Sequence, residues 1–129
     1  ALFLYSAIPA MAQNYVKPDV FKQWLESGKS MFIVDIQTPD EFAMHHFKKA
    51  IETNAFPAKT DDEKKKLDPV LVKIKASKDD VVIVCPRGGG GARNTYDYFK
   101  TKGVPESRMY ILEKGISGWP YKDMFVKGR

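Results

Sequence analysis

Cys85 is the only cysteine of the chain, and it stands where a protein would activate a nucleophile. It follows Val81–Val84, four apolar and mostly β-branched residues that predict a strand buried on both faces. Four glycines, Gly88–Gly91, come next, and apolar residues at helical spacing begin at Ala92. A sulfur between a strand end and a helix start lies near unpaired amides and the positive end of the helix dipole, which both favour the thiolate. The spacing therefore predicts a reactive cysteine.

The glycine run distinguishes this interpretation from a simpler one, in which Cys85 is a small buried hydrophobic residue at a strand end. Four glycines cost conformational entropy, and a purely structural turn needs only one or two. A glycine backbone also allows several N–H groups to converge on one point above the sulfur. We therefore expect the loop to bind an anion.

Other motifs with chemical potential are incomplete. His45 and His46 are adjacent and would point about 100° apart on a helix, and no further ligand stands at a suitable spacing, so we expect structural histidines and no metal. Gly28-Lys29-Ser30 lacks the first glycine of a Walker loop, and a C-x-x-C redox motif would need a second cysteine. We expect no cofactor.

Length and charge limit the classes of partner. At 129 residues, with 43% hydrophobic and 29% charged residues, the chain suits one globular domain with a single core. The net charge is +5, but the lysines are scattered, and the run 64–66 directly follows the acidic run 61–63. This pattern is typical of a solvated helix face rather than a nucleic-acid surface. A small anionic substrate fits the modest positive charge.

Residues 1–12 differ from the rest because they carry no charged side chain and are mostly apolar. They end in Ala10-Met11-Ala12, a small-x-small pattern typical of export cleavage, so we interpret them as a signal-peptide remnant preceding one domain at 13–129. The protein would then be periplasmic or otherwise exported. The remnant is too short to span a bilayer, and the mature form would need no membrane. An apolar arm packed on the domain is the alternative interpretation.

The elements that would position Cys85 alternate between helices and strands. Capping boxes at Thr38 and Thr60 and a helix-ending Gly28 mark helix boundaries. This rhythm predicts an α/β fold: a mostly parallel central sheet with helices on both faces and any site at the carboxyl ends of the strands. The expected elements are helices at 18–28, 39–44, from 60, from 68 and 92–102, strands at 31–34, 81–84 and 109–112, and an extended stretch at 50–56. A short helix and turn are expected at 115–120, with Trp119 packed on the core.

Four stretches together resemble the rhodanese (sulfurtransferase) family. Ile33–Phe42 is similar to its first strand and following helix, and His46–Ile51 to its histidine-isoleucine-x-glycine-alanine segment. Val81–Ala92 is similar to its active-site loop, and Leu112–Trp119 to its closing G-G-x-x-x-W element. The four stretches follow one another with the family's spacing over most of the chain. The resemblance implies a rhodanese-like fold.

The chain departs from the family pattern at several positions. Gln37 replaces an arginine, and His45, Lys49 and Lys114 replace glycines. The common loop, C-x-x-G-x-R-S, has an arginine where this chain has Gly90, or Gly91 if the loop is one residue longer. The related dual-specificity phosphatases and arsenate reductases have a C-x5-R loop, with arginine at the position of Gly91. Without that arginine, phosphoryl transfer lacks its bidentate clamp.

The resemblance implies that Cys85 is the nucleophile and carries a persulfide. Sulfane sulfur would pass from thiosulfate or polysulfide, a small anionic donor, to a thiol, sulfite or cyanide. The backbone amides of Arg87, Gly88, Gly89, Gly90 and Gly91 would hold the outer sulfur, and Arg87 and Arg93 would attract the anion. For both arginines the alternative is simple solvation.

Two further functions stay open on the same resemblance. The first is a rhodanese-like binding or sulfur-carrier module that does not turn over, and the second is a phosphatase or arsenate reductase. The physiological donor, the acceptor and the oligomeric state do not follow from the sequence.

Overall fold

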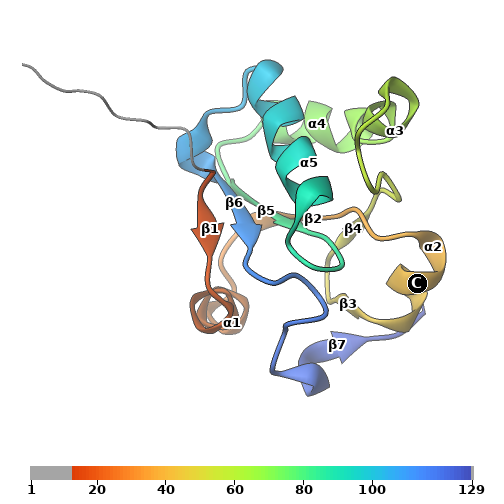
Figure 1. Cartoon of the computed structure of the whole chain (residues 1–129). Coiled ribbons are helices and arrows are strands. Elements are labelled where there is room, and N and C mark those ends of the chain that lie inside the picture. Colours follow the sequence, from red (N-terminus) through yellow and green to blue (C-terminus); the bar gives the residue numbers. More distant parts are fainter. Residues whose placement is uncertain (1–12, 129) are drawn as a thin grey trace, which may run out of the picture.

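A computed structural model describes residues 13–128 (Figure 1). The predicted signal remnant, residues 1–12, lies outside the described residues, and export stays a prediction. The strands are Tyr15–Val16 (β1), Met31–Asp35 (β2), His46–Phe47 (β3), Ile51–Glu52 (β4), Asp80–Val84 (β5), Met109–Leu112 (β6) and Phe125–Val126 (β7). The helices are Pro18–Ser27 (α1), Pro39–Met44 (α2), Asp61–Lys65 (α3), Asp68–Lys75 (α4) and Gly90–Thr101 (α5), with 3₁₀ turns at Glu106–Arg108 and Lys122–Met124.

The central sheet has five parallel strands in the order β1-β6-β5-β2-β4. β5, which leads to Cys85, lies in the middle between β2 and β6. Such a strand is covered on both faces, which explains its unbroken apolar run. The predicted α/β fold with a mostly parallel sheet is confirmed. A separate antiparallel pair joins β3 to β7.

Helices cover both faces of the sheet, as predicted (Figure 1). Successive residues of β5 alternate between two cores: Ile83 and Cys85 belong to the one that α4 and α5 complete, while Val82 and Val84 belong to the one that α1 completes. This is the two-residue period of a strand. Cys85 therefore faces the side of the sheet where α5 lies.

The helix boundaries follow the capping signals. α1 begins at Pro18 and ends at Gly28, which has φ +74° and a backbone N–H that donates to the Leu25 carbonyl. α2 begins beside Thr38, whose N–H donates to Glu41 Oε1. At α3, the Glu63 N–H donates to Thr60 Oγ1 and the Thr60 N–H donates to Glu63 Oε1. None of the described helices is long and apolar enough to cross a membrane.

The structure differs from the sequence predictions at the start of α5, after β6 and in three short strands. α5 begins at Gly90, two residues before the expected Ala92, so two of the loop glycines belong to the helix. Residues 113–118 form consecutive turns where a short helix was expected, although Trp119 is fully buried as predicted. β1, β3 and β7 have no counterpart among the predicted strands, because two residues are too short to show a strand period.

Candidate active site

The Cys85 sulfur lies at the carboxyl end of β5 and is almost fully buried, the residue being 1% exposed. The Gly88 N–H donates to Sγ at 2.8 Å. A donor three residues ahead can reach back because Gly88 has φ +70°, a conformation that glycine adopts without strain. The loop thus folds over the sulfur and gives it a hydrogen bond that a thiolate accepts more strongly than a thiol.

A pocket of about 330 Å³ opens beside the sulfur. Of the predicted site residues, Cys85, Arg87 and the glycines 89–91 line this pocket. Gly88 does not line it but donates the hydrogen bond to the sulfur. Arg93 lies exposed on α5, outside the lining. Residues on the segment after β4 form its other wall. Its lining is Phe56, Pro57, Cys85, Pro86, Arg87, Gly89, Gly90, Gly91 and Asn94.

Free hydrogen-bond donors lie at the start of α5. The backbone N–H groups of Gly89, Gly90 and Gly91 have no acceptor among residues 13–128. The first N–H groups of a helix have no partner within it, and the helix dipole places partial positive charge there. Because all three glycines line the pocket with Cys85, the pocket can accept an anion next to the sulfur.

The turn after β6 holds the backbone of the Cys85 loop by hydrogen bonds. The Ile116 N–H donates to the Cys85 carbonyl at 3.0 Å, and the Ser117 N–H donates to the Pro86 carbonyl at 2.9 Å. Gly115 has φ +58°, and a Cβ there would lie 2.2 Å from the Cys85 oxygen. The two backbones approach so closely that only glycine fits. This contact gives a physical reason for the second glycine of the closing element.

Phe56 fills the space next to Gly91. A Cβ on Gly91 would lie 2.8 Å from Phe56 Cδ1, and Gly91 is buried. Gly91 is the position at which the phosphatase-type loop carries arginine. In this chain the Phe56 ring occupies the space through which such a side chain would have to leave the backbone.

Asp35 is a buried ionisable residue near the loop that no sequence motif singles out. It ends β2, is fully buried, and accepts hydrogen bonds from the Gln37 N–H at 2.9 Å and from Gln37 Nε2 at 3.0 Å. Burial raises the pKa of the carboxyl to about 7 against these two donors, which lower it. Gln37 stands where the family usually has arginine, so Asp35 receives hydrogen bonds there without a cation. The polar residue at the end of an apolar strand was the available signal.

The two histidines occupy different surroundings. His46 is buried, stacks on Phe42 with ring centroids 3.9 Å apart, and places Nδ1 2.8 Å from the Phe42 carbonyl oxygen. This is the structural role expected from the sequence. His45 lines a smaller pocket of about 270 Å³ together with Arg87 and Gln37, and the His45 carbonyl accepts a hydrogen bond from Gln37 Nε2. Within residues 13–128, no cluster of three or more histidine, cysteine or acidic residues could hold a metal ion.

The sequence matches the family model for a rhodanese-like domain over residues 17–122. The chain belongs to the rhodanese-like family. This match covers most of the chain, and it includes the β5–α5 loop and the closing turn that supports it. A comparison with curated protein sequences finds no match.

Solved structures share the rhodanese fold at low sequence identity. A rhodanese-like domain protein from Staphylococcus aureus is 19% identical with a TM-score of 0.65, over 91% of this chain and 100% of that one. A thiosulfate sulfurtransferase from Pseudomonas aeruginosa is 13% identical with a TM-score of 0.67, over 97% of this chain and 22% of that one. A yeast protein tyrosine phosphatase of the rhodanese family is 17% identical with a TM-score of 0.62, over 82% and 83%. The fold thus occurs with both chemistries.

Proposed function

We propose that this rhodanese-like domain is a sulfurtransferase in which Cys85 carries the transferred sulfur as a persulfide. The observation that carries the proposal is the hydrogen bond from the Gly88 N–H to Cys85 Sγ, at the edge of a pocket lined by further unpaired glycine N–H groups. The backbone N–H that donates to the sulfur stabilises negative charge on it. Persulfide chemistry needs such a site in both of its half-reactions.

The reaction has two balanced steps. The Cys85 thiolate attacks the outer sulfur of thiosulfate, a new S–S bond forms, and the original S–S bond breaks with its electron pair leaving on sulfite. The anionic persulfide then remains on Cys85. An acceptor such as cyanide attacks the terminal sulfur, the Cys85–sulfur bond breaks, and thiocyanate and the thiolate result. A polysulfide can replace thiosulfate, and a thiol or sulfite can replace cyanide.

The residues of the loop would have different roles in these steps. The N–H groups of Gly89, Gly90 and Gly91 would stabilise the terminal sulfur and the departing anion, because both carry negative charge beside the start of α5. Arg87 is exposed and lines the pockets on both sides of the loop, so it would attract the anionic donor. Arg93 would contribute only charge from outside the pocket. Pro86 has no N–H to donate.

The arrangement favours sulfur transfer over phosphoryl transfer. An arginine that clamps the equatorial oxygens is central to C-x5-R phosphatases, and Gly91 with the Phe56 ring against it occupies that position. Sulfur transfer to and from a persulfide needs donors for a single charged sulfur, which backbone amides can supply. Hydrolysis of a small aryl phosphate that disappears in C85S would reverse this preference.

A comparison of the wild type with Cys85→Ser tests the proposal. With thiosulfate alone, the wild type is expected to gain the mass of one sulfur atom, and with thiosulfate and cyanide it is expected to form thiocyanate over many turnovers. C85S should do neither. Circular dichroism and urea unfolding of both proteins check that the variant is folded. Thiocyanate formation by folded C85S would exclude Cys85 as the nucleophile.

A sulfur-carrier module is the second candidate. It is favoured by two observations: within residues 13–128 only the Gly88 N–H donates to the sulfur, and a glycine stands at the position of the loop arginine. A carrier would load one sulfur per chain and then stop with cyanide, sulfite and small thiols alike. Measured side by side, continued turnover with any of these acceptors supports the enzyme, and loading without turnover supports the carrier.

A further inference from the structure

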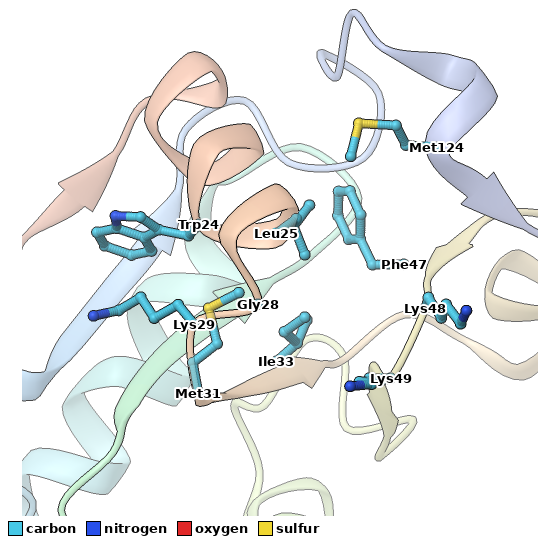
Figure 2. A pocket seen from close by; sticks show the side chains of 10 residues that line it. All are labelled: Trp24, Leu25, Gly28, Lys29, Met31, Ile33, Phe47, Lys48, Lys49 and Met124. Atoms are coloured by element: carbon cyan, nitrogen blue, oxygen red, sulfur yellow. The ribbon is translucent and has the colours of Figure 1, made fainter.

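A second pocket lies on the face of the sheet opposite to Cys85. It has a volume of about 400 Å³ and opens between the end of α1, the start of β2 and the segment that joins β3 to β4 (Figure 2). Ile33 and Phe47, which line it, are buried members of the core on the α1 face, whereas Cys85 belongs to the other core. The volume falls in the range of about 300–1,000 Å³ typical of small-molecule sites.

Apolar side chains form most of the lining. Trp24 and Leu25 come from α1, Met31 from β2 and Met124 from the turn before β7, and each is only partly buried (Figure 2). Partly exposed tryptophan, leucine and methionine side chains around a concavity offer a surface that an apolar ligand would cover.

The three charged residues of the lining, Lys29, Lys48 and Lys49, are all positive, and only Lys29 has an acidic partner among residues 13–128. Lys29 is 3.2 Å from Asp80 Oδ2, and its Nζ lies 5.0 Å from the centre of the Trp24 ring. Lys48 and Lys49 have no ion pair within residues 13–128. α1 ends at Gly28 on the other side of the pocket, and the carbonyl end of a helix carries partial negative charge. An anionic group therefore belongs on the side of Lys48 and Lys49.

The backbone of Lys49, at the rim of the pocket, is strained. Its φ is +71°, a region that residues with a Cβ rarely adopt and in which glycine is at ease. The Lys49 ammonium sits at the rim of the apolar pocket without an ion pair among residues 13–128.

We propose that this pocket binds a small anionic amphiphile, such as a medium-chain carboxylate. The carboxylate would contact Lys49, with the charge of Lys48 beside it, and the apolar body would lie on Leu25, Ile33 and Phe47. The apolar lining selects the body, and the uncompensated lysines select the sign of the head group. The site is separate from Cys85, and the proposal does not depend on sulfur transfer.

Calorimetric titration of the full chain with decanoate, below its micelle concentration, tests the proposal. Decanoate is expected to bind saturably with one molecule per chain. Decanol and decylamine, which have the same apolar body with a neutral or cationic head, should bind roughly tenfold more weakly, because they gain no contact with the lysines. Equal binding of decanol and decanoate, or no saturable binding of decanoate, would overturn the proposal.

A matched pair of variants assigns the site. Lys49→Gly is expected to weaken decanoate binding about three- to fivefold, the effect of one partly exposed charge contact, and to leave decanol unchanged. Lys114→Gly is the control, because Lys114 also has a positive φ, +66°, and lies outside this pocket. The two exchanges remove the same charge and the same type of strain. Equal effects of K49G and K114G on decanoate binding would overturn the assignment. A second test offers the protein vesicles of anionic phosphatidylglycerol. Binding to these vesicles without binding of monomeric decanoate would also overturn the proposal.

Discussion

Three of the four glycines of the loop are glycine for different reasons. Gly88 needs a positive φ, and a Cβ there would lie 2.8 Å from the Lys114 nitrogen. Gly91 needs the space that Phe56 fills. Gly90 has neither constraint, since a Cβ there would meet nothing closer than 3.9 Å. Its backbone is exposed at the start of α5, so the absence of a side chain leaves its N–H accessible from the pocket. Packing therefore explains two of these glycines, and access to the backbone explains Gly90.

Gly88→Ala should destabilise the domain, whereas Gly90→Ala should not. The alanine at 88 combines a strained φ with a backbone clash, so we expect a loss of about 2 kcal/mol or more in the free energy of unfolding. At position 90, alanine replaces glycine in a helix with room for the methyl group, so we expect a change of about 0–1 kcal/mol towards higher stability. Urea unfolding measures both. Equal stabilities of G88A and G90A would contradict the geometry of the loop.

Asp35 should make stability depend on pH. Its folded pKa of about 7 lies above the ordinary value of 3.8, so between these pH values the folded state holds a proton that the unfolded state has lost. Stability is then fully present below about pH 4 and falls by about 1.4 kcal/mol per pH unit as pH rises towards 7.

Urea unfolding of the wild type and Asp35→Asn from pH 4.5 to 8 measures this slope. The wild type should lose stability relative to D35N up to about pH 7, and the difference should be constant above it. The comparison uses slopes because the asparagine amide would oppose Gln37 Nε2 and change the absolute stability at every pH. Parallel curves for the two proteins would show that Asp35 titrates normally.

At the scale of elements, the site is made where segments distant in sequence meet. The helix and strand assignments followed from short-range signals: the Pro18 start and Gly28 end of α1, the capping pairs, and the apolar run of β5. The contact of Phe56 with Gly91 and the support of Cys85 by the turn at 115–117 depend on tertiary approach, which spacing along the chain does not contain. Cys85 and its loop could therefore be located from sequence, while the pocket that they form with Phe56 could not.

The contact between the Phe56 segment and the loop should appear as coupling between substitutions. Gly91→Ala alone should cost about 1–3 kcal/mol in the free energy of unfolding, because the added methyl group overpacks the Phe56 ring. In a Phe56→Ala background the same change should cost less, with an interaction energy of about 1–2 kcal/mol. Combining G91A with Val72→Ala, an exposed position on α4, should be additive and serves as the control. Additivity of the Gly91 and Phe56 changes would mean that the ring moves aside freely.

At the scale of the whole molecule, the parallel sheet brings the ends of its strands to one edge and separates two surfaces. Cys85 faces the α5 side, and the lysine-rimmed apolar pocket lies on the α1 side. The alternation of helix and strand signals along the sequence predicts this architecture, because alternating helices and strands leave few other arrangements. The second pocket could not be predicted, since it depends on how α1 and the β3–β4 segment leave part of the sheet uncovered. The net charge of +5 acts on both surfaces as a general attraction for anions.

If the proposed sulfur transfer is correct, this attraction should appear in its salt dependence. The rate at limiting thiosulfate, kcat/KM, should fall severalfold between about 0.01 M and 0.3 M NaCl, because the screening length shortens from about 30 Å to well below 10 Å. Arg87→Gln should lower kcat/KM at low salt and flatten its dependence on salt, since Arg87 lines the pocket mouth. Lys75→Gln removes the same charge at the end of α4, before the amino end of β5, and should change neither quantity by more than a small fraction. Stopped-flow or steady-state thiocyanate assays at several salt concentrations make the comparison. Equal slopes for the two variants would show that the net charge, and not Arg87, attracts the donor.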